Sequence, residues 1–157
     1  MKTKVMSVVC VLALLLTLTA CGGSDSQPQK SAAEIADAIY STQTFQDTLN
    51  AIDADMLGDY YRIDAADLTD SKVYVSGSFS TAEEIAVFQA SSSGAVENIK
   101  KAIDTRLEDL KLAFENYVPG EMTKINDPVL ITKGTTVVLV LADDTAAVSD
   151  QVNELLK

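Results

Sequence analysis

A long amphipathic stretch from Ser93 to Val118 constrains the fold more than any other feature of this sequence. Its apolar residues recur at steps of three and four, which is the spacing of one face of an α-helix. They are Val96, Ile99, Ile103, Leu107, Leu110, Phe114 and Tyr117. Pro119 and Gly120 then end the helix. Because no second long helix is available to pair with it as a coiled coil, we expect the stripe to pack on a sheet of the same chain.

Two pairs of β-branched segments predict that sheet. Residues 72–78 alternate apolar and polar side chains, and residues 85–90 are rich in strand-forming residues. The second of these segments could instead be a helix capped near Thr81, but a hairpin explains both segments together. Residues 129–132 and 135–142 flank Lys133-Gly134, which predicts a second hairpin with a tight turn.

Shorter helices are expected around the hairpins. Ser31 and Glu34 have the spacing of a capping box that opens a short helix. Residues 45–61 show helical spacing interrupted by a glycine and several aspartates, which predicts a short helix and a loop. Asp143 or Asp144 can cap a final helix at the C-terminus.

These elements predict an α+β fold for a single domain over residues 31–157. Its core would be a mainly antiparallel sheet of about four strands, built from the two hairpins, with helices packed on one face. Residues 21–30 are small, polar and unpatterned, so we expect a flexible tether before the domain.

The N-terminus has the layout of an export signal that ends in a lipobox. Lys2 and Lys4 precede an apolar stretch, and Leu18-Thr19-Ala20-Cys21 matches the site at which bacterial lipoproteins are lipidated and cut. We therefore expect residues 1–20 to be removed and Cys21 to carry lipid, including palmitate, on the extracytoplasmic face of the cell membrane. An uncleaved transmembrane helix is the alternative, but residues 5–20 fall short of the ~20 apolar residues that a span needs.

The composition excludes several kinds of site. The sequence contains no histidine, so catalytic triads based on histidine and histidine-rich zinc sites are excluded. Cys10 would leave with the signal and Cys21 would be lipidated, which leaves no cysteine for a disulfide, a nucleophile or a metal. The net charge is −11 before the two signal lysines are removed, which argues against nucleic acid and favours neutral or cationic partners.

Several short segments resemble a known family. They are Tyr60-Tyr61-Arg62-Ile63-Asp64, Glu84-Ile85-Ala86-Val87-Phe88, Arg106, Tyr117-Val118-Pro119, and Gly134 with Val137-Val138. Over roughly residues 31–145 the chain is similar to the small Gram-positive lipoproteins grouped as domain of unknown function 4358. The resemblance implies a lipoprotein of α+β type, and it implies no activity, substrate or catalytic residue.

The acidic segment of residues 53–64 is a candidate calcium-binding loop. Asp53, Asp55, Gly58 and Asp64 fit four positions of an EF-hand-like loop. Leu57 stands where the loop needs an oxygen ligand, so an acidic turn that caps a helix is the simpler interpretation.

Paired acids and tyrosines are the remaining candidates. The doublets Glu83-Glu84 and Asp143-Asp144 could act as acid and base on a glycan. However, adjacent residues on a strand point to opposite faces of the sheet, so a doublet seldom forms a facing pair. Helix capping is the simpler explanation for Asp143-Asp144. Tyr60-Tyr61 could stack on wall sugars, or one ring could lie in the core. Residues 91–94 resemble a phosphate-binding turn but fit a helix cap better.

The sequence is compatible with two functions. The first is a non-catalytic module that binds an envelope protein or a wall component, and the second is a carboxylate-based hydrolase of cell-wall glycan. An exposed apolar patch would favour the first, and two facing carboxylates, one with a raised pKa, would favour the second. The sequence assigns no catalytic, cofactor or metal residue, and the oligomeric state stays open.

Overall fold

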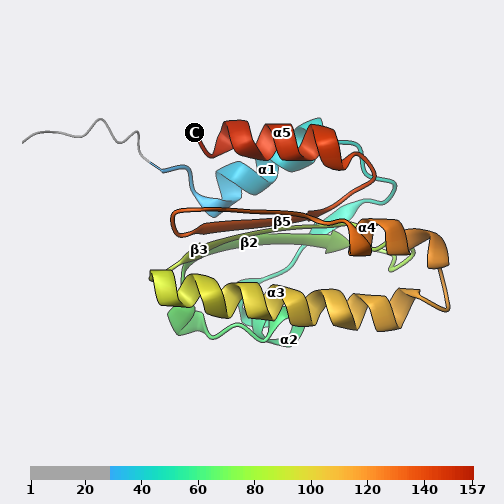
Figure 1. Ribbon diagram of the computed structural model, residues 1–157, viewed down its shortest axis with the longest axis horizontal. Helices are drawn as coiled ribbons and strands as arrows, with labels where there is room; N and C mark the ends of the chain where they lie inside the picture. The colour runs from blue at the N-terminus through green and yellow to red at the C-terminus, as the bar shows by residue number, and fades with distance from the viewer. Residues whose placement is uncertain (1–28) are drawn as a thin grey trace, which may run out of the picture.

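A computed structural model describes residues 29–157, so the predicted signal peptide and Cys21 lie outside the described residues. The described chain forms a five-stranded antiparallel sheet between two layers of helices (Figure 1). The strand order is β1-β2-β3-β5-β4. The strands are β1 (Leu49–Ala51), β2 (Leu68–Ser76), β3 (Glu84–Ala90), β4 (Val129–Lys133) and β5 (Thr136–Leu141). The α+β prediction is confirmed, with one strand more than expected.

Both predicted hairpins are present. β2 pairs with β3, and β4 pairs with β5 through a turn in which Gly134 has a φ of +59°, a conformation that glycine adopts without strain. The two hairpins join through β3 and β5, where Val87 lies opposite Val138. β2 begins at Leu68, earlier than the alternating pattern predicted. A register shift between Leu68 and Asp70 interrupts the alternation in this first part of the strand.

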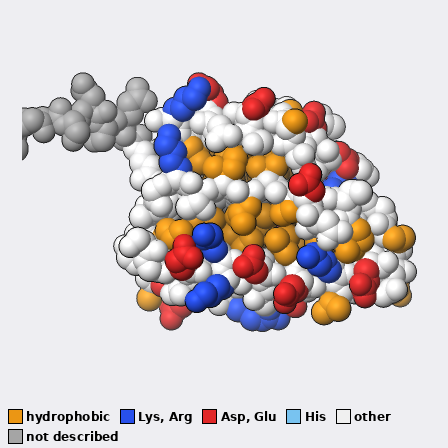
Figure 2. Space-filling model, viewed as in Figure 1, with side chains coloured by type: hydrophobic (Ala, Val, Ile, Leu, Met, Phe, Trp, Pro, Cys, Tyr) orange, Lys and Arg blue, Asp and Glu red, His pale blue; other side chains and the backbone are white. Residues whose placement is uncertain are grey.

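Helices cover both faces of the sheet, so the prediction that they pack on one face is wrong. Helices α1 (Ala32–Thr42) and α5 (Thr145–Leu155) lie on one side, and α2 (Leu57–Tyr61) and α3 (Ser93–Phe114) lie on the other (Figure 1). The reason is that β3 is apolar on both faces: Val87 belongs to the core under α1 and α5, and Phe88 belongs to the core under α3. Figure 2 shows these two apolar layers as separate orange bands.

The helix ends follow the predicted chemistry. Ser31 and Glu34 form the capping box of α1, and Asp144, rather than Asp143, caps α5 by accepting a hydrogen bond from the backbone N–H of Ala147. α3 ends at Phe114, four residues before the predicted end, because residues 115–117 form a turn. The prediction that Tyr117 belongs to the apolar stripe of this helix is therefore wrong, and its side chain is exposed.

Short elements account for most of the other differences. Residues 45–61 contain β1 and a 3₁₀ turn (Ala54–Met56) before α2, so the predicted short helix is present but the strand was missed. A second 3₁₀ turn (Ala65–Asp67) precedes β2. A third (Pro119–Glu121) leads into α4 (Met122–Asn126), which the sequence did not reveal.

The described chain enters the fold at one end of the sheet. The side chain of Gln29 donates to Thr136 Oγ1 at the start of β5, and Gln89 Nε2 near the end of β3 donates to the carbonyl of Lys30. The β2–β3 connection lies at the opposite end of these antiparallel strands. Over residues 29–157 no helix is both long enough and apolar enough to cross a membrane.

Candidate binding groove and the buried charges beneath it

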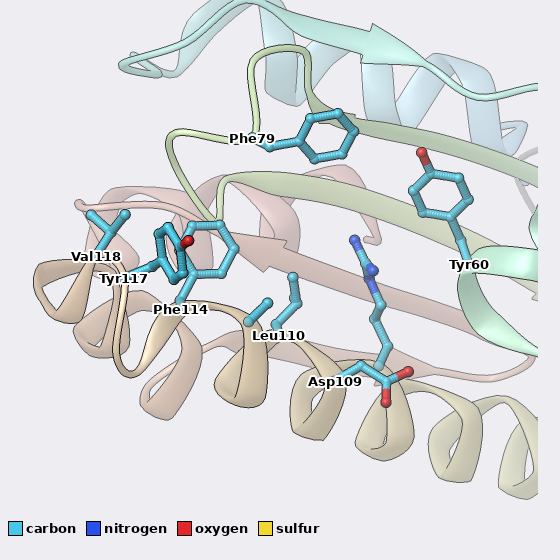
Figure 3. A pocket seen from close by; sticks show the side chains of 9 residues that line it. Tyr60, Phe79, Asp109, Leu110, Phe114, Tyr117 and Val118 are labelled. Atoms are coloured by element: carbon cyan, nitrogen blue, oxygen red, sulfur yellow. The ribbon is translucent and has the colours of Figure 1, made fainter.

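An open groove of about 350 Å³ lies at the end of the molecule that is remote from Gln29. It lies between α2, the β2–β3 loop, the second half of α3 and the turn that follows α3 (Figure 3). Its lining residues are Tyr60, Phe79, Arg106, Asp109, Leu110, Ala113, Phe114, Tyr117 and Val118. Most of them are apolar, and Arg106 and Asp109 are the charged exceptions.

Two aromatic rings at this groove are strongly exposed. Phe79 is 73% exposed and Tyr117 is 89% exposed, whereas Phe114 beneath them is buried. Figure 3 shows Phe79 and Tyr60 on one side of the open space, with Leu110 and Phe114 of α3 on the other. Aromatic rings grouped in water at a concave site are typical of an interaction surface rather than of a folding core.

The loop that carries Phe79 is held in place by a carboxylate. Phe79 has a φ of +56°, which is strained for a bulky side chain. Asp47 Oδ2 accepts hydrogen bonds from Ser76 Oγ (2.6 Å), Ser78 N (2.9 Å) and Ser78 Oγ (2.6 Å). These bonds hold the pKa of Asp47 far below its ordinary value. The hydrogen bonds of Asp47 therefore hold the start of the loop that carries Phe79.

A buried ion pair forms part of the groove wall. Arg106 donates from Nε (3.2 Å) and Nη2 (2.7 Å) to Glu84 Oε2, and the Arg106 side chain is 16% exposed. The other oxygen of Glu84 accepts a hydrogen bond from the hydroxyl of buried Tyr61. Burial, together with the charge of Glu84, raises the pKa of Tyr61, so this hydroxyl stays protonated.

Arg106 keeps hydrogen-bonding capacity beyond this pair. Its guanidinium carbon lies 5.2 Å from the ring centre of Tyr60 and 5.9 Å from that of Tyr61, within cation–π range. Among residues 29–157, no acceptor pairs with its Nη1 group. These N–H groups can therefore donate to an oxygen atom of a ligand.

A second buried charge cluster supports the loops beside the groove. Lys124 Nζ lies 2.9 Å from Glu121 Oε2, 3.2 Å from Asp143 Oδ1 and 3.8 Å from Glu83 Oε1. Glu83 also accepts hydrogen bonds from the backbone N–H groups of Gln46 (2.9 Å) and Asp47 (3.0 Å). Hydrogen bonds from Gln46 and Lys124 lower the pKa of Asp143. The cluster, which we call the Lys124 clasp, joins α4, the start of β3 and the connections that follow α1 and β5.

The carboxylate doublets are occupied by structural partners. Glu83 contacts Lys124 and Glu84 contacts Arg106, so the two carboxylates turn to different partners, as predicted for neighbours on an extended chain. Asp144 caps α5, while Asp143 contacts Lys124. In the described part of the chain, every carboxyl group with a shifted pKa has it lowered; they are Glu34, Asp47, Asp143 and Glu154.

The acidic segment from Asp53 to Asp64 differs in conformation from an EF-hand-like loop. Leu57 is buried in the core beside α3, and Asp64 accepts a hydrogen bond from the N–H of Ala66. Within residues 29–157, no three metal-ligating side chains are grouped to hold an ion. The segment instead forms a 3₁₀ turn and α2, which places Tyr60 at the groove.

The tyrosine pair and residues 91–94 were candidates for ligand binding, and each contains a residue with a structural role. Tyr61 lies in the core, while Tyr60 lines the groove, so the pair divides as expected. Ser92 caps α3 by accepting from the N–H of Ala95, which makes residues 91–94 a linker and a cap.

Sequence reasoning missed Arg106 and Phe79 as site residues. A signal for Arg106 was present, because it lies three residues after Ile103 and four before Leu110 and so shares their helix face. A cation on an apolar helix face indicates a buried counter-charge. Nothing in the pattern around Phe79 separates it from an ordinary loop residue.

Comparison with known proteins gives one match. The sequence model of the family described as domain of unknown function (DUF4358) matches residues 42–142, a range that contains the whole sheet and the groove. No curated protein and no solved structure is similar enough to the chain to count as a match.

Proposed function

This chain belongs to the DUF4358 family of domains of unknown function, and from that premise we propose that it is a non-catalytic binding module of the bacterial cell envelope. Lipid on Cys21 holds it on the extracytoplasmic face of the membrane. Its groove binds a partner in the space beyond the membrane. Residues 21–30 form the tether between the lipid and the domain, and the last two of them, Gln29 and Lys30, contact the fold.

The exposed aromatic rim of the groove carries this proposal. Phe79 and Tyr117 leave large apolar surfaces in water around a concave site, although a position inside the core would stabilise the fold more. Phe79 also keeps a strained backbone, and strain of this kind is often retained at functional sites.

The position of the groove supports a partner away from the bilayer. Gln29 and Lys30 contact the sheet where β3 ends and β5 begins, while the β2–β3 loop that carries Phe79 lies at the other end. A domain tethered through residue 29 would therefore present the groove away from its anchor. A protein or wall component fits this orientation better than a lipid headgroup.

Site-specific crosslinking in living cells tests the binding role. A photoreactive phenylalanine replaces Phe79 or Tyr117, and a matched variant carries it at Leu112 of α3, which is 72% exposed but does not line the groove. We expect discrete crosslinked products from positions 79 and 117 and none from position 112. Equal labelling at all three positions, or no labelling at 79 and 117, contradicts the proposal.

The anchor has its own test. We expect growth with labelled palmitate to label the wild-type chain, and Cys21→Ser to remove both the label and the attachment to membranes. An unlabelled wild-type chain, or a serine variant that stays in the membrane fraction, contradicts the proposed anchor.

The alternative, a carboxylate-based hydrolase of wall glycan, has less support. Glu83 and Glu84 are both buried and paired with cations, and a general acid needs a carboxyl group that reaches the substrate. Release of soluble sugar fragments from purified cell walls by the purified chain would favour this alternative over the binding module.

A further inference from the structure

We infer that the groove binds a polypeptide segment that buries two bulky uncharged side chains against Phe79 and α3 and carries lysine or arginine on its flanks. The inference rests on the proposed binding function and names the partner's chemistry.

The size of the groove limits what can be buried in it. If each heavy atom occupies about the ~30 Å³ of a water molecule, 350 Å³ holds roughly a dozen heavy atoms. This is the combined size of one aromatic and one aliphatic side chain. A complete helix or a folded domain would instead contact the rim, with two anchoring residues inside.

The charged residues of the groove are already paired. Arg106 contacts Glu84 at 2.7 Å, and Asp109 contacts Arg62 at 2.8 Å. A buried ligand charge would therefore find no free counter-charge, and an uncompensated buried charge is costly. The buried part of the partner is thus neutral, and a backbone carbonyl can accept from Arg106 Nη1.

The parts of the bound segment that lie outside the groove are near the surface of an acidic protein. The chain carries 23 acidic and 12 basic side chains. Exposed Asp59 and Glu115 stand directly beside groove residues Tyr60 and Phe114 in the chain. A basic segment is attracted by this field, whereas a second copy of the same acidic chain is repelled.

The lining favours a peptide over a glycan. Sugar rings need hydrogen-bond partners for several hydroxyl groups in addition to an aromatic platform. Phe79, Leu110, Phe114 and Val118 offer no side-chain donor or acceptor. The polar lining is limited to the hydroxyls of Tyr60 and Tyr117 and to Arg106 and Asp109, which are already in ion pairs. The apolar lining residues suit apolar side chains, and protein interfaces concentrate their binding energy in such aromatic anchors.

Peptide selection tests the inference. Short random peptides displayed on phage are selected on the immobilised full-length chain in detergent micelles. Selected peptides are then measured by fluorescence anisotropy against the wild type, the double variant Phe79→Ala/Tyr117→Ala and the control Leu112→Ala. We expect selected peptides to share two bulky apolar residues and a positive net charge, and to bind more weakly at high salt.

The double variant should weaken binding at least about tenfold, and Leu112→Ala should leave it unchanged. Circular dichroism confirms that both variants are folded. Selected peptides that bind the double variant as tightly as the wild type overturn the inference. Failure to enrich any peptide also overturns it, as does a glycan fragment that binds in a Phe79-dependent way. If crosslinking at position 79 succeeds in any of these cases, the binding module stands and only the peptide assignment falls.

Discussion

Replacing Lys124 with methionine should destabilise the fold more than any surface change, because it removes the only cation of the Lys124 clasp within residues 29–157. Methionine keeps most of the bulk of the lysine side chain, so the cavity that remains is small. The side chains of Glu83 and Lys124 are 0% and 2% exposed, so Glu83 would lose its cation in a nearly dry site. The variant therefore measures the electrostatic role of Lys124.

The expected magnitude follows from the burial of the pair. Removing one partner of a buried ion pair costs about 3–5 kcal/mol, because the other charge is left uncompensated. Glu83 still accepts hydrogen bonds from Gln46 N, Asp47 N and Thr81 Oγ1, which places the expected loss near the lower value, about 3 kcal/mol. A domain of this size has roughly 5–15 kcal/mol of stability, so a folded but weaker variant is expected.

Urea unfolding followed by circular dichroism measures this loss. The control is Lys100→Met, since Lys100 forms an exposed pair with Glu97 at 3.3 Å and should change stability by less than about 0.5 kcal/mol. Adding Glu83→Gln to Lys124→Met should recover about 1 kcal/mol or more, because the stranded charge is gone. A Lys124→Met variant as stable as the Lys100→Met control would show that Lys124 does not stabilise the fold by compensating Glu83.

The remaining predictions concern the groove and the acid range. Phe79→Gly should raise the free energy of unfolding by about 1 kcal/mol, because it relieves the positive φ and the exposed ring contributes little burial; a lower urea midpoint than that of the wild type would contradict this. Tyr61→Phe should cost about 1–3 kcal/mol in the same assay, because Glu84 Oε1 loses its donor, and an unchanged midpoint would show that water replaces the hydroxyl. The native pKa values of Asp47 and Asp143 lie below their unfolded values, so their stabilisation is fully present above about pH 4 and is lost as the pH falls further. Stability measured against pH should therefore fall on the acid side, and Asp47→Asn should show a shallower fall than the wild type.

Particular residues show how far the sequence predicts the fold. The spacing of the α3 stripe, the Ser31–Glu34 box and the turn at Gly134 depend on local chemistry, and all three are present. The prediction missed that helices cover both faces of the sheet. A signal for this was present, because β5 is an almost continuous apolar run and is buried at every position, as strands covered on both faces are. β1 is too short, at three residues, to show an alternating pattern.

The groove was less predictable than the fold. Its residues come from α2, α3 and the β2–β3 loop, and only the tertiary arrangement brings them together. Phe79 lies in a loop and belongs to no periodic pattern. Tyr117 has the spacing of the α3 stripe, which wrongly predicted a core position, because the helix ends at Phe114 and the ring is 89% exposed. Tyr60 was already a candidate for ligand contact in the sequence, and Arg106 was detectable as a cation on an apolar helix face.

At this end of the molecule, the residues that hold the loops are different from the residues that are exposed at the groove. The Lys124 clasp fixes the backbone of Asp47 through Glu83, and the carboxylate of Asp47 in turn fixes the loop that carries Phe79. The rings of Phe79 and Tyr117 themselves contribute little to folding. Descendants of one ancestral scaffold could therefore exchange these two rings for other side chains and acquire new partners, while the frame beneath them stays the same.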